Sequence, residues 1–459
     1  MRVPLNTIRP SLHLRIEVLV LKKVLVANRG EIAVRIIRAC HNLGLKAVAV
    51  YSTADKNSLH VQLADEAICI GPAEPNKSYL NIHEIIAAAE ITQSDAIHPG
   101  YGFLSENEEF AKKCEDEKIT FIGPQSHVIA LMGEKSRARE TMLAVDVPVV
   151  PGGDTEFTDV ISGLAYAKKI GFPVMLKASA GGGGKGMRVI KSADLFAKEF
   201  GLAQSEAQHA FNDNHMYLEK YLPHPRHIEV QIIADQQGNV TAVGERDCTI
   251  QQHHQKVIEE APAIALPEET RQKMFAVSVK AAKKIGYIGA GTMEFLLDDP
   301  EHFYFMEMNT RIQVEHPVSE LTSGLDLVEL QLLVAQGKPL PFKQERISAN
   351  GFALECRINA LTAGKISGLH LPAGYGIRVD TGLYQGYVVP PNYDSMIAKI
   401  ITFAPSRQKA ITLMKNALDE TVISGVNTNL DFLMQLLNES DYVENKTDIN
   451  WLDKLTTTI

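Results

Sequence analysis

The sequence predicts a multidomain fold that combines an α/β domain with α+β regions. Its 459 residues suffice for roughly three domains of about 150 residues each. The first regular stretch alternates strand, helix and strand, whereas the strands of the second half follow one another without that alternation. Hydrophobic residues make up 45% of the chain and charged residues 22%, a composition that supports several apolar cores.

The α/β domain is expected to span residues 22–123. KVLVAN, from Lys23, has the pattern of a buried strand, GEIAVRIIRACHNLG that of an amphipathic helix ending at Gly44, and KAVAVYS that of a second strand. AICIG, AIHPG and TFIG continue the alternation, which predicts a parallel, Rossmann-like sheet. The turn NRGEIA lacks the G-x-G-x-x-G pattern, so a dinucleotide site is not supported there.

The remaining segments are predicted from changes in pattern. Residues 124–150 should form a helical connector, residues 151–222 a small lid unit, and residues 223–459 an α+β core with the C-terminal domain. The first twenty residues hold three Arg and one acidic residue but no hydrophobic region or cleavage site. We therefore expect residues 1–21 to be a dispensable extension, with organelle targeting as the alternative.

Charge and cysteine usage narrow the class of partner and the compartment. The formal net charge of -9 argues against a nucleic-acid partner, whose phosphates require a basic surplus. No apolar run has the length of a membrane span, so no membrane association is expected. Five scattered cysteines without C-x-x-C spacing indicate neither a disulfide scaffold nor a zinc site, and favour a reducing compartment. A cytoplasmic location is therefore expected.

A run of glycines in the lid unit predicts a phosphate-binding flap. Gly181–Gly184 and Gly186 precede MRVI, which has the pattern of a strand, so the run should be a hairpin tip and not the start of a helix. It is not a Walker A loop, because Gly186 follows Lys185. With Lys177 and Arg188 alongside, a mobile basic flap could cover a triphosphate. The alternative is a flexible hairpin without a ligand.

Two strands near residue 300 predict a metal site. In GTMEFLL and FYFMEMN a plausible register pairs Glu294 with Glu307, and Asn309 shares the face of Glu307. Opposed carboxylates on apolar strands repel each other, and a divalent cation such as Mg²⁺ would remove the repulsion. An exposed acidic pair is the alternative.

Arg311, Gln313 and Glu315 continue the second strand at two-residue intervals. If the segment stays extended, the three side chains point the same way as the metal carboxylates. A cation, an amide and a carboxylate beside a metal-bound triphosphate would suit a small oxyanion, with the carboxylate as base. A surface salt-bridge network is the alternative.

Four motifs resemble the ATP-grasp enzymes and, within them, the biotin carboxylases. The motifs are HPGYGFLSEN at 98–107, KASAGGGGKGMR at 177–188, ERDCTIQQHHQKVIEEAP at 245–262 and EMNTRIQVEHPVSE at 307–320. The similarity runs from about residue 22 to near the C-terminus. It implies a biotin carboxylase N-terminal domain, an ATP-grasp domain with a mobile glycine-rich lid and a biotin carboxylase C-terminal domain.

The resemblance also implies a set of site residues. The residues implied for ATP are Lys135, Lys177, Gly181, Gly182, Gly183, Gly184, Met187, Glu219, Lys220, Leu222, His227, Gln251, His254, Glu294 and Leu296. Glu294, Glu307 and Asn309 are implied to bind two Mg²⁺ ions, with Mn²⁺ as a substitute. The residues implied for bicarbonate and biotin are Lys256, Arg311, Gln313, Val314, Glu315 and Arg357, of which Glu315, Arg311, Lys256 and Arg357 are the catalytic candidates.

The implied reaction is ATP- and bicarbonate-dependent carboxylation of biotin on a separate biotin carboxyl carrier protein, with separate carboxyltransferase subunits. Acetyl-CoA carboxylase in fatty acid synthesis is the expected setting, and a split pyruvate or other acyl-CoA carboxylase is the alternative. An ATP-grasp carboxylate–amine ligase and a non-catalytic nucleotide-binding subunit are the competing classes. The resemblance further implies a homodimer through the first domain, with Arg35 as a candidate contact.

One motif departs from the family pattern. Gln252 and His253 occupy positions where the family usually has two arginines, which changes the local charge. His253 and His254 are expected on a strand, where adjacent side chains point apart and cannot share a zinc ion. Cys248 lacks a partner base and is interpreted as a small packing residue.

Overall fold

The computed structural model describes residues 21–179, 187–211, 213–253, 255–342 and 347–458. The N-terminal domain is built on a five-stranded parallel sheet with strand order β3-β2-β1-β4-β5, so the predicted parallel sheet is confirmed. Its elements are β1 Lys23–Val26, α1 Gly30–Asn42, β2 Lys46–Tyr51, α2 Leu59–Leu63, β3 Glu66–Cys69, α3 Ile82–Ile91, β4 Ala96–His98, α4 Glu108–Asp116 and β5 Thr120–Phe121. Apolar side chains of β1 and β2 pack against the inner face of α1 in one buried cluster. This packing of a helix on a sheet explains why the alternating strands and helices fold as a layered domain.

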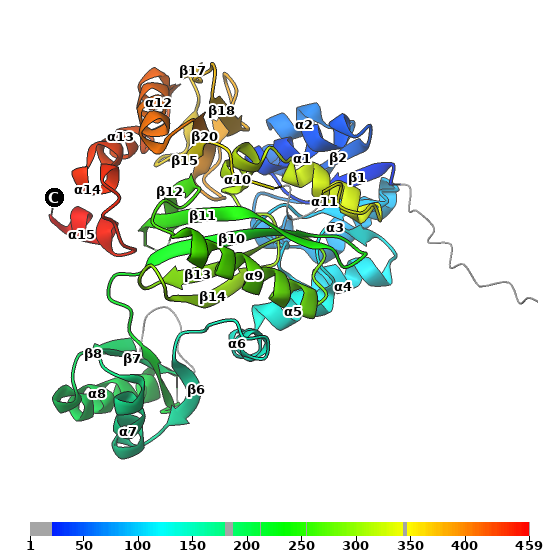
Figure 1. Cartoon of the computed structure of the whole chain (residues 1–459). Helices are drawn as coiled ribbons and strands as arrows, with labels where there is room; N and C mark the ends of the chain where they lie inside the picture. The colour runs from blue at the N-terminus through cyan, green and yellow to red at the C-terminus, as the bar shows by residue number, and fades with distance from the viewer. Residues whose placement is uncertain (1–20, 180–186, 212, 254, 343–346, 459) are drawn as a thin grey trace, which may run out of the picture.

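Two helices, α5 Ser126–Gly133 and α6 Lys135–Leu143, lead to a small four-stranded antiparallel sheet with order β6-β9-β7-β8. This lid sheet and its two helices lie apart from the rest of the molecule, at the lower left of Figure 1. Its elements are β6 Gly152–Phe157, α7 Val160–Ile170, β7 Val174–Ala178, β8 Met187–Ile190, α8 Ala193–Phe211 and β9 Met216–Lys220. β7 and β8 pair antiparallel with Lys177 opposite Met187, so the glycine run joins two strands of a hairpin, as predicted.

An eight-stranded sheet with order β14-β13-β10-β11-β12-β15-β20-β18 forms the centre of the molecule (Figure 1). β12 pairs antiparallel with β15, so segments separated by about ninety residues of sequence share one sheet. The strands are β10 Arg226–Ala234, β11 Val240–Gln252, β12 Gln255–Ala261, β13 Gly289–Leu297, β14 Phe303–Asn309, β15 Phe352–Asn359, β18 Ile377–Thr381 and β20 Met396–Ala404.

Helices and four short strands complete the second half of the chain. The helices are α9 Glu268–Lys284, α10 His316–Ser323, α11 Leu327–Ala335, α12 Arg407–Glu420, α13 Leu430–Asn438, α14 Ser440–Val443 and α15 Trp451–Thr458. The short strands are β16 Gly364–Lys365, β17 Gly368–His370, β19 Val388–Val389 and β21 Val422–Ser424, paired as β16 with β19 and β17 with β21. Within the described residues, no helix is long and apolar enough to cross a membrane.

Candidate active site

A cavity of about 780 Å³ lies between the N-terminal domain and the central sheet. The N-terminal domain contributes residues 28–32 and residues 101–103, the second of which belong to the HPGYGFLSEN motif. Residues predicted for the site also line it: Lys135, His227, Gln251, Lys256, Glu294, Leu296, Glu307, Asn309, Arg311, Gln313, Val314, Glu315 and Arg357. The fold therefore gathers all of the predicted metal and oxyanion residues, and five of the fifteen predicted nucleotide residues, around one space.

Four charged residues form a row across neighbouring strands of the central sheet. The register pairs Glu307 with Glu294, Glu294 with Glu229, and Glu229 with Arg246. The first of these pairs is the register predicted from the sequence. Because register partners lie on the same face of a sheet, three carboxylates and one guanidinium lie side by side. Glu229, Glu294 and Arg246 are buried, so their charges require close polar partners.

Glu294 has many polar partners. Lys256 Nζ and His227 Nε2 each lie 3.1 Å from one of its oxygens. The side-chain amides of Asn309 and Gln313 donate to it at 2.9 and 2.7 Å. Burial by itself would raise the pKa of Glu294, but Lys256 and His227 outweigh burial and hold that pKa well below its usual range. Glu294 is therefore an anion at every physiological pH.

Glu307 is in the opposite situation. Burial and the neighbouring charge of Glu294 raise its pKa, and it forms no ion pair with any residue that the structure describes. A divalent cation would remove this repulsion, and the oxygen atoms of Glu294, Glu307 and Asn309 are the hard ligands that Mg²⁺ prefers. The donor set therefore fits the predicted metal. We call Glu294, Glu307 and Asn309 the metal end of the cavity.

Glu315 lies at the other side of Lys256 and is held by two cations. Lys256 Nζ lies 2.5 Å from Glu315 Oε1, and Arg357 Nη2 lies 3.0 Å from Glu315 Oε2. Arg357 also forms an ion pair with Glu259, with Nε donating to Oε1 at 2.6 Å. Burial opposes ionisation of Glu315, but Lys256 and Arg357 hold its pKa well below its usual range. We call Lys256, Glu315 and Arg357, which line the cavity, together with the fully buried Glu259, the acceptor end.

Arg246 connects the metal end and the acceptor end through its hydrogen bonds and its ion pair. Its fully buried guanidinium donates to the Oγ1 of Thr292 at 3.0 Å and to the Oε1 of Gln313 at 2.6 Å. It also donates to the Oε1 of Gln231 at 2.7 Å and forms an ion pair with Glu229. Lys256 Nζ approaches the second oxygen of Glu229 to 2.5 Å. Arg246 and Glu229 therefore anchor the side chains that form both ends.

The segment between β14 and α10 corrects one prediction. The backbone is not a strand after Asn309, and it turns into α10 at His316. Gln313 and Glu315 still reach the cavity, because the turn lies directly above the central sheet, and the buried Lys399 Nζ donates to the carbonyl of Val314 at 2.7 Å. The extended conformation was therefore wrong, whereas the grouping of the three side chains around one cavity is observed.

Arg311 points toward the metal end. Its Nη2 donates to Asn309 Oδ1 at 2.8 Å, and its Nε lies 2.7 Å from Glu106 Oε2. Glu106 belongs to HPGYGFLSEN, so this motif reaches the cavity through an ion pair as well as through Tyr101 and Phe103.

The described lid residues lie away from the cavity. Lys177 forms an ion pair with Glu219, Lys220 Nζ donates to the carbonyl of Gly171 at 3.3 Å, and Leu222 is buried in the protein. None of these four predicted nucleotide residues lines the cavity. Arg188, predicted to place positive charge beside the flap, forms ion pairs with Glu199 and Glu206 of α8. Gly181–Gly184, His254 and the side chain of Met187 lie outside the described residues.

The turn between β11 and β12 corrects a second prediction. His253 lies in that turn with a φ of 50°, and not on a strand as expected, because β11 and β12 pair up to Gln252 and Gln255. Gln251 Nε2 lies 2.7 Å from His227 Nδ1. Cys248 is fully buried, and burial raises the pKa of its thiol well above the usual range, which agrees with a packing role and not with a nucleophile.

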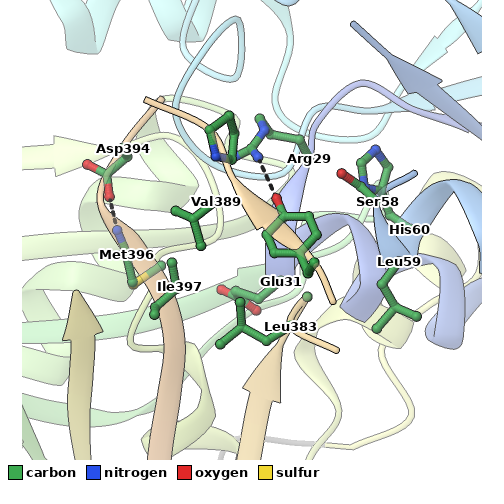
Figure 2. Close-up of a pocket in the computed structure, with 14 residues that line it drawn as sticks. Arg29, Glu31, Ser58, Leu59, His60, Leu383, Val389, Asp394, Met396 and Ile397 are labelled. Atoms are coloured by element: carbon green, nitrogen blue, oxygen red, sulfur yellow. Dashed lines mark hydrogen bonds between the residues drawn. The ribbon is translucent and has the colours of Figure 1, made fainter. Parts of the chain in front are cut away.

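A second, much smaller cavity of about 30 Å³ adjoins the first one (Figure 2). Arg29, Glu31, Asp394 and Met396 line both cavities. The small cavity can hold one or two water molecules, since a water requires roughly 10–15 Å³ by this measure. It lies at the contact between the N-terminal domain and the start of β20.

Comparison with known proteins decides the family. Three family models match the chain: Biotin carboxylase, N-terminal domain over residues 20–129, Carbamoyl-phosphate synthase L chain, ATP binding domain over residues 134–343, and Biotin carboxylase C-terminal domain over residues 355–454. The chain belongs to the biotin carboxylase family. A biotin carboxylase from Haemophilus influenzae is 52% identical over 442 residues, which cover 95% of this chain and 98% of that relative.

Solved biotin carboxylases have the same fold. The biotin carboxylase–beta-gamma-ATP complex from Campylobacter jejuni superposes with a TM-score of 0.86 at 51% identity, covering 95% of this chain and 99% of that one. The biotin carboxylase domain dimer of 2-oxoglutarate carboxylase from Hydrogenobacter thermophilus, in complex with MgADP, ADP and bicarbonate, gives a TM-score of 0.84 at 46% identity, covering 95% and 97%. The predicted three-domain fold is thus confirmed, and the chain is a biotin carboxylase, an ATP-dependent ligase.

Some residues of this biotin carboxylase site were missed by the sequence analysis. Glu229, Arg246 and Glu259 each bind a predicted residue directly. One signal was present: HIEVQ and IEEAP place glutamates beside apolar residues within predicted strands, and a charge that is buried at such a position requires a partner. The identity of those partners was not available, because it depends on pairing between distant strands.

Proposed function

We propose that this biotin carboxylase uses ATP and bicarbonate to carboxylate the biotin of a separate carrier protein through carboxyphosphate. The observation that carries the proposal is Glu315, a buried carboxylate held between Lys256 and Arg357 and joined through Lys256 to the metal end. A base, two cations and a metal-binding pair within one cavity suit the activation of a small oxyanion beside a triphosphate.

Glu315 is the proposed base. In the free site its negative charge is balanced by Lys256 and Arg357, so it is a weak base there. Bicarbonate entering beside Lys256 and Arg311 would compete with Glu315 for the positive charge of Lys256. The pKa of Glu315 would rise because its interaction with that cation becomes weaker. Glu315 then takes the proton of bicarbonate, and the carbonate oxygen attacks the γ-phosphorus of ATP, which breaks the bond to the bridging oxygen of ADP.

The metal end is proposed to stabilise the negative charge on ADP, the leaving group. Glu294, Glu307 and Asn309 would hold Mg²⁺, which when bound neutralises charge on the β- and γ-phosphates. Lys135, His227, Gln251 and Leu296 line the same part of the cavity and are proposed to contact the nucleotide. The lid residues Lys177, Gly181–Gly184, Met187, Glu219, Lys220 and Leu222, together with His254, are proposed to complete the ATP site when the lid closes.

The second half of the reaction uses the acceptor end. Carboxyphosphate separates into CO₂ and phosphate, phosphate takes the N1 proton of biotin, and N1 attacks CO₂. Arg357 is proposed to stabilise the enolate-like ureido oxygen that forms meanwhile, with Gln313 and Val314 shaping the bicarbonate pocket. Closure of the lid would keep water from carboxyphosphate.

We further propose the biological setting. The reaction would be the first half-reaction of acetyl-CoA carboxylase, with a biotin carboxyl carrier protein and carboxyltransferase subunits as partners, in the cytoplasm. Carboxylases for other acceptors also contain this type of unit: solved relatives include a biotin carboxylase domain of 2-oxoglutarate carboxylase and a biotin carboxylase subunit of pyruvate carboxylase. A homodimer is proposed from the dimer reported for the Hydrogenobacter domain. Arg35, the candidate contact, already pairs with Glu320 and Asp326 of its own chain, at 2.8 and 2.6 Å.

The test is ADP release by the purified protein with Mg²⁺ and ATP, with and without bicarbonate and free biotin. We expect release to require bicarbonate, to rise with biotin, and to fall roughly 100- to 10,000-fold in Glu315→Gln. Glu269→Gln on the exposed face of α9 is the control and should behave like the parent. Release that ignores bicarbonate would contradict the proposal and favour a carboxylate–amine ligase.

A further inference from the structure

Glu259 occupies an unusual position at the acceptor end. It lies on β12, is fully buried, and is one of two carboxylates that bracket the Arg357 guanidinium. Its Oε1 accepts from Arg357 Nε at 2.6 Å, while Arg357 Nη2 also reaches Glu315 Oε2 at 3.0 Å. Its Oε2 makes no hydrogen bond with any described residue. The carboxylate therefore serves Arg357 alone.

The two carboxylates differ in what the reaction does to them. Glu315 becomes neutral when it takes the proton of bicarbonate, and it then ceases to balance the charge of Arg357. The Arg357 guanidinium is only 17% exposed, and a mostly buried guanidinium without a counter-ion is disfavoured. Glu259 is the partner that remains charged and in contact at that moment.

We propose that Glu259 is a positioning residue for biotin carboxylation, which keeps the Arg357 guanidinium in place and charge-balanced while Glu315 is protonated. The inference rests on the proposed role of Arg357 toward the ureido oxygen of biotin. It assigns Glu259 to the second half of the reaction and not to ATP cleavage, because its contact is with Arg357 and not with Lys256 or the metal end.

A neighbouring glutamate provides a matched control. Glu355 of β15 is the register partner of Glu259 and is equally buried, but neither of its oxygens makes a hydrogen bond with a described residue. Glu355 forms no ion pair with Arg357 among the described contacts, and burial raises its pKa well above its usual range, which weakens it as a counter-ion. Burial also raises the pKa of Glu259, to about 7, and Arg357 opposes that rise. Assays at about pH 8 therefore keep Glu259 charged.

The experiment compares Glu259→Gln with Glu355→Gln in the full-length protein. Two rates are measured for each: bicarbonate-dependent ADP release without biotin, and carboxylation of free biotin. In Glu259→Gln we expect ADP release within about threefold of the parent, and a roughly 10- to 100-fold fall in kcat for biotin carboxylation with little change in the KM for biotin. Glu355→Gln should resemble the parent in both rates.

Arg357→Gln and its combination with Glu259→Gln distinguish a failure of this inference from a failure of the proposed role of Arg357. If Glu259 acts through Arg357, the pair Glu259→Gln with Arg357→Gln should carboxylate biotin no worse than Arg357→Gln alone, since the shared interaction is already lost. The double variant removes both partners of the ion pair and so leaves no unpaired charge at this position. It can therefore be compared with Arg357→Gln even if Glu259→Gln alone does not fold. Normal carboxylation by Glu259→Gln, an equal loss of both its rates, or additive losses in the pair would overturn the inference. Normal carboxylation by Arg357→Gln would instead refute the proposed role of Arg357, and with it the inference.

Discussion

The two ends of the cavity solve the problem of buried negative charge in different ways. At the acceptor end, Glu259 and Glu315 are matched by Lys256 and Arg357 within the protein itself. At the metal end, Lys256 serves Glu294, and Glu307 is left without an ion pair among the described residues. The first end is therefore balanced before any substrate arrives, whereas the second keeps a repulsion between carboxylates that a cation from solution would relieve.

This difference explains what each end can do. A balanced cluster holds its side chains in place, and in the proposed mechanism it provides a base only when a competing anion arrives. An unbalanced pair of carboxylates has a standing affinity for a divalent cation, because binding relieves a repulsion that the fold imposes. Lys256 contacts Glu229, Glu294 and Glu315, so it couples the two ends electrostatically.

The largest effect on stability is expected from the residue shared by both ends. Arg246→Met leaves Glu229 without its guanidinium partner and Gln313 without its donor, so the free energy of unfolding should fall by about 3–5 kcal/mol. Urea unfolding followed by circular dichroism measures this change. Arg137→Met, on an exposed face of α6, is the control. An unchanged midpoint would show that the two ends are not joined through Arg246.

A smaller loss is expected at the well-partnered carboxylate of the metal end. Glu294→Gln, measured without metal, should lower the free energy of unfolding by about 1–3 kcal/mol, because Lys256 and His227 lose a charged acceptor. The folded pKa of Glu294 is depressed, so its contribution is present above its unfolded pKa and is lost as the pH falls. The cost of Glu294→Gln should therefore shrink in acid. A cost that is independent of pH would contradict this account.

The smallest effect has the opposite sign. Glu307→Gln should stabilise the metal-free protein by about 0.5–1 kcal/mol, because it removes a like charge opposite Glu294. The folded pKa of Glu307 is raised, so the stability it provides is present at low pH and is lost as the pH rises through that pKa. The gain from Glu307→Gln should therefore increase from about pH 5 to pH 8.

Mg²⁺ provides the check on that prediction. Added Mg²⁺ should raise the melting temperature of the parent but not that of Glu307→Gln, so the advantage of the variant should disappear in its presence. A variant less stable than the parent without metal would mean that the metal end is balanced after all.

Sequence reasoning was most successful where the argument was local. Alternation along β13 and β14 placed Glu294 opposite Glu307, and the strand after the glycine run predicted the lid hairpin. It failed where the backbone changed direction: the segment after Asn309 turns into α10, and His253 lies in a turn. A two-residue period holds only while a strand continues, and nothing in TRIQVE signals its end before the proline of α10.

The sequence by itself determined the composition of the site: which carboxylates lie on apolar strands, where the glycine flap lies, and which motifs resemble the biotin carboxylases. Only the tertiary structure decided how the charges are matched. Lys256 and Arg357 meet Glu315, and Arg357 meets Glu259, because β12 pairs with β15 and α10 returns above the sheet. Those neighbours are far apart along the chain, and electrostatic balance depends on distance in space, which no local pattern encodes.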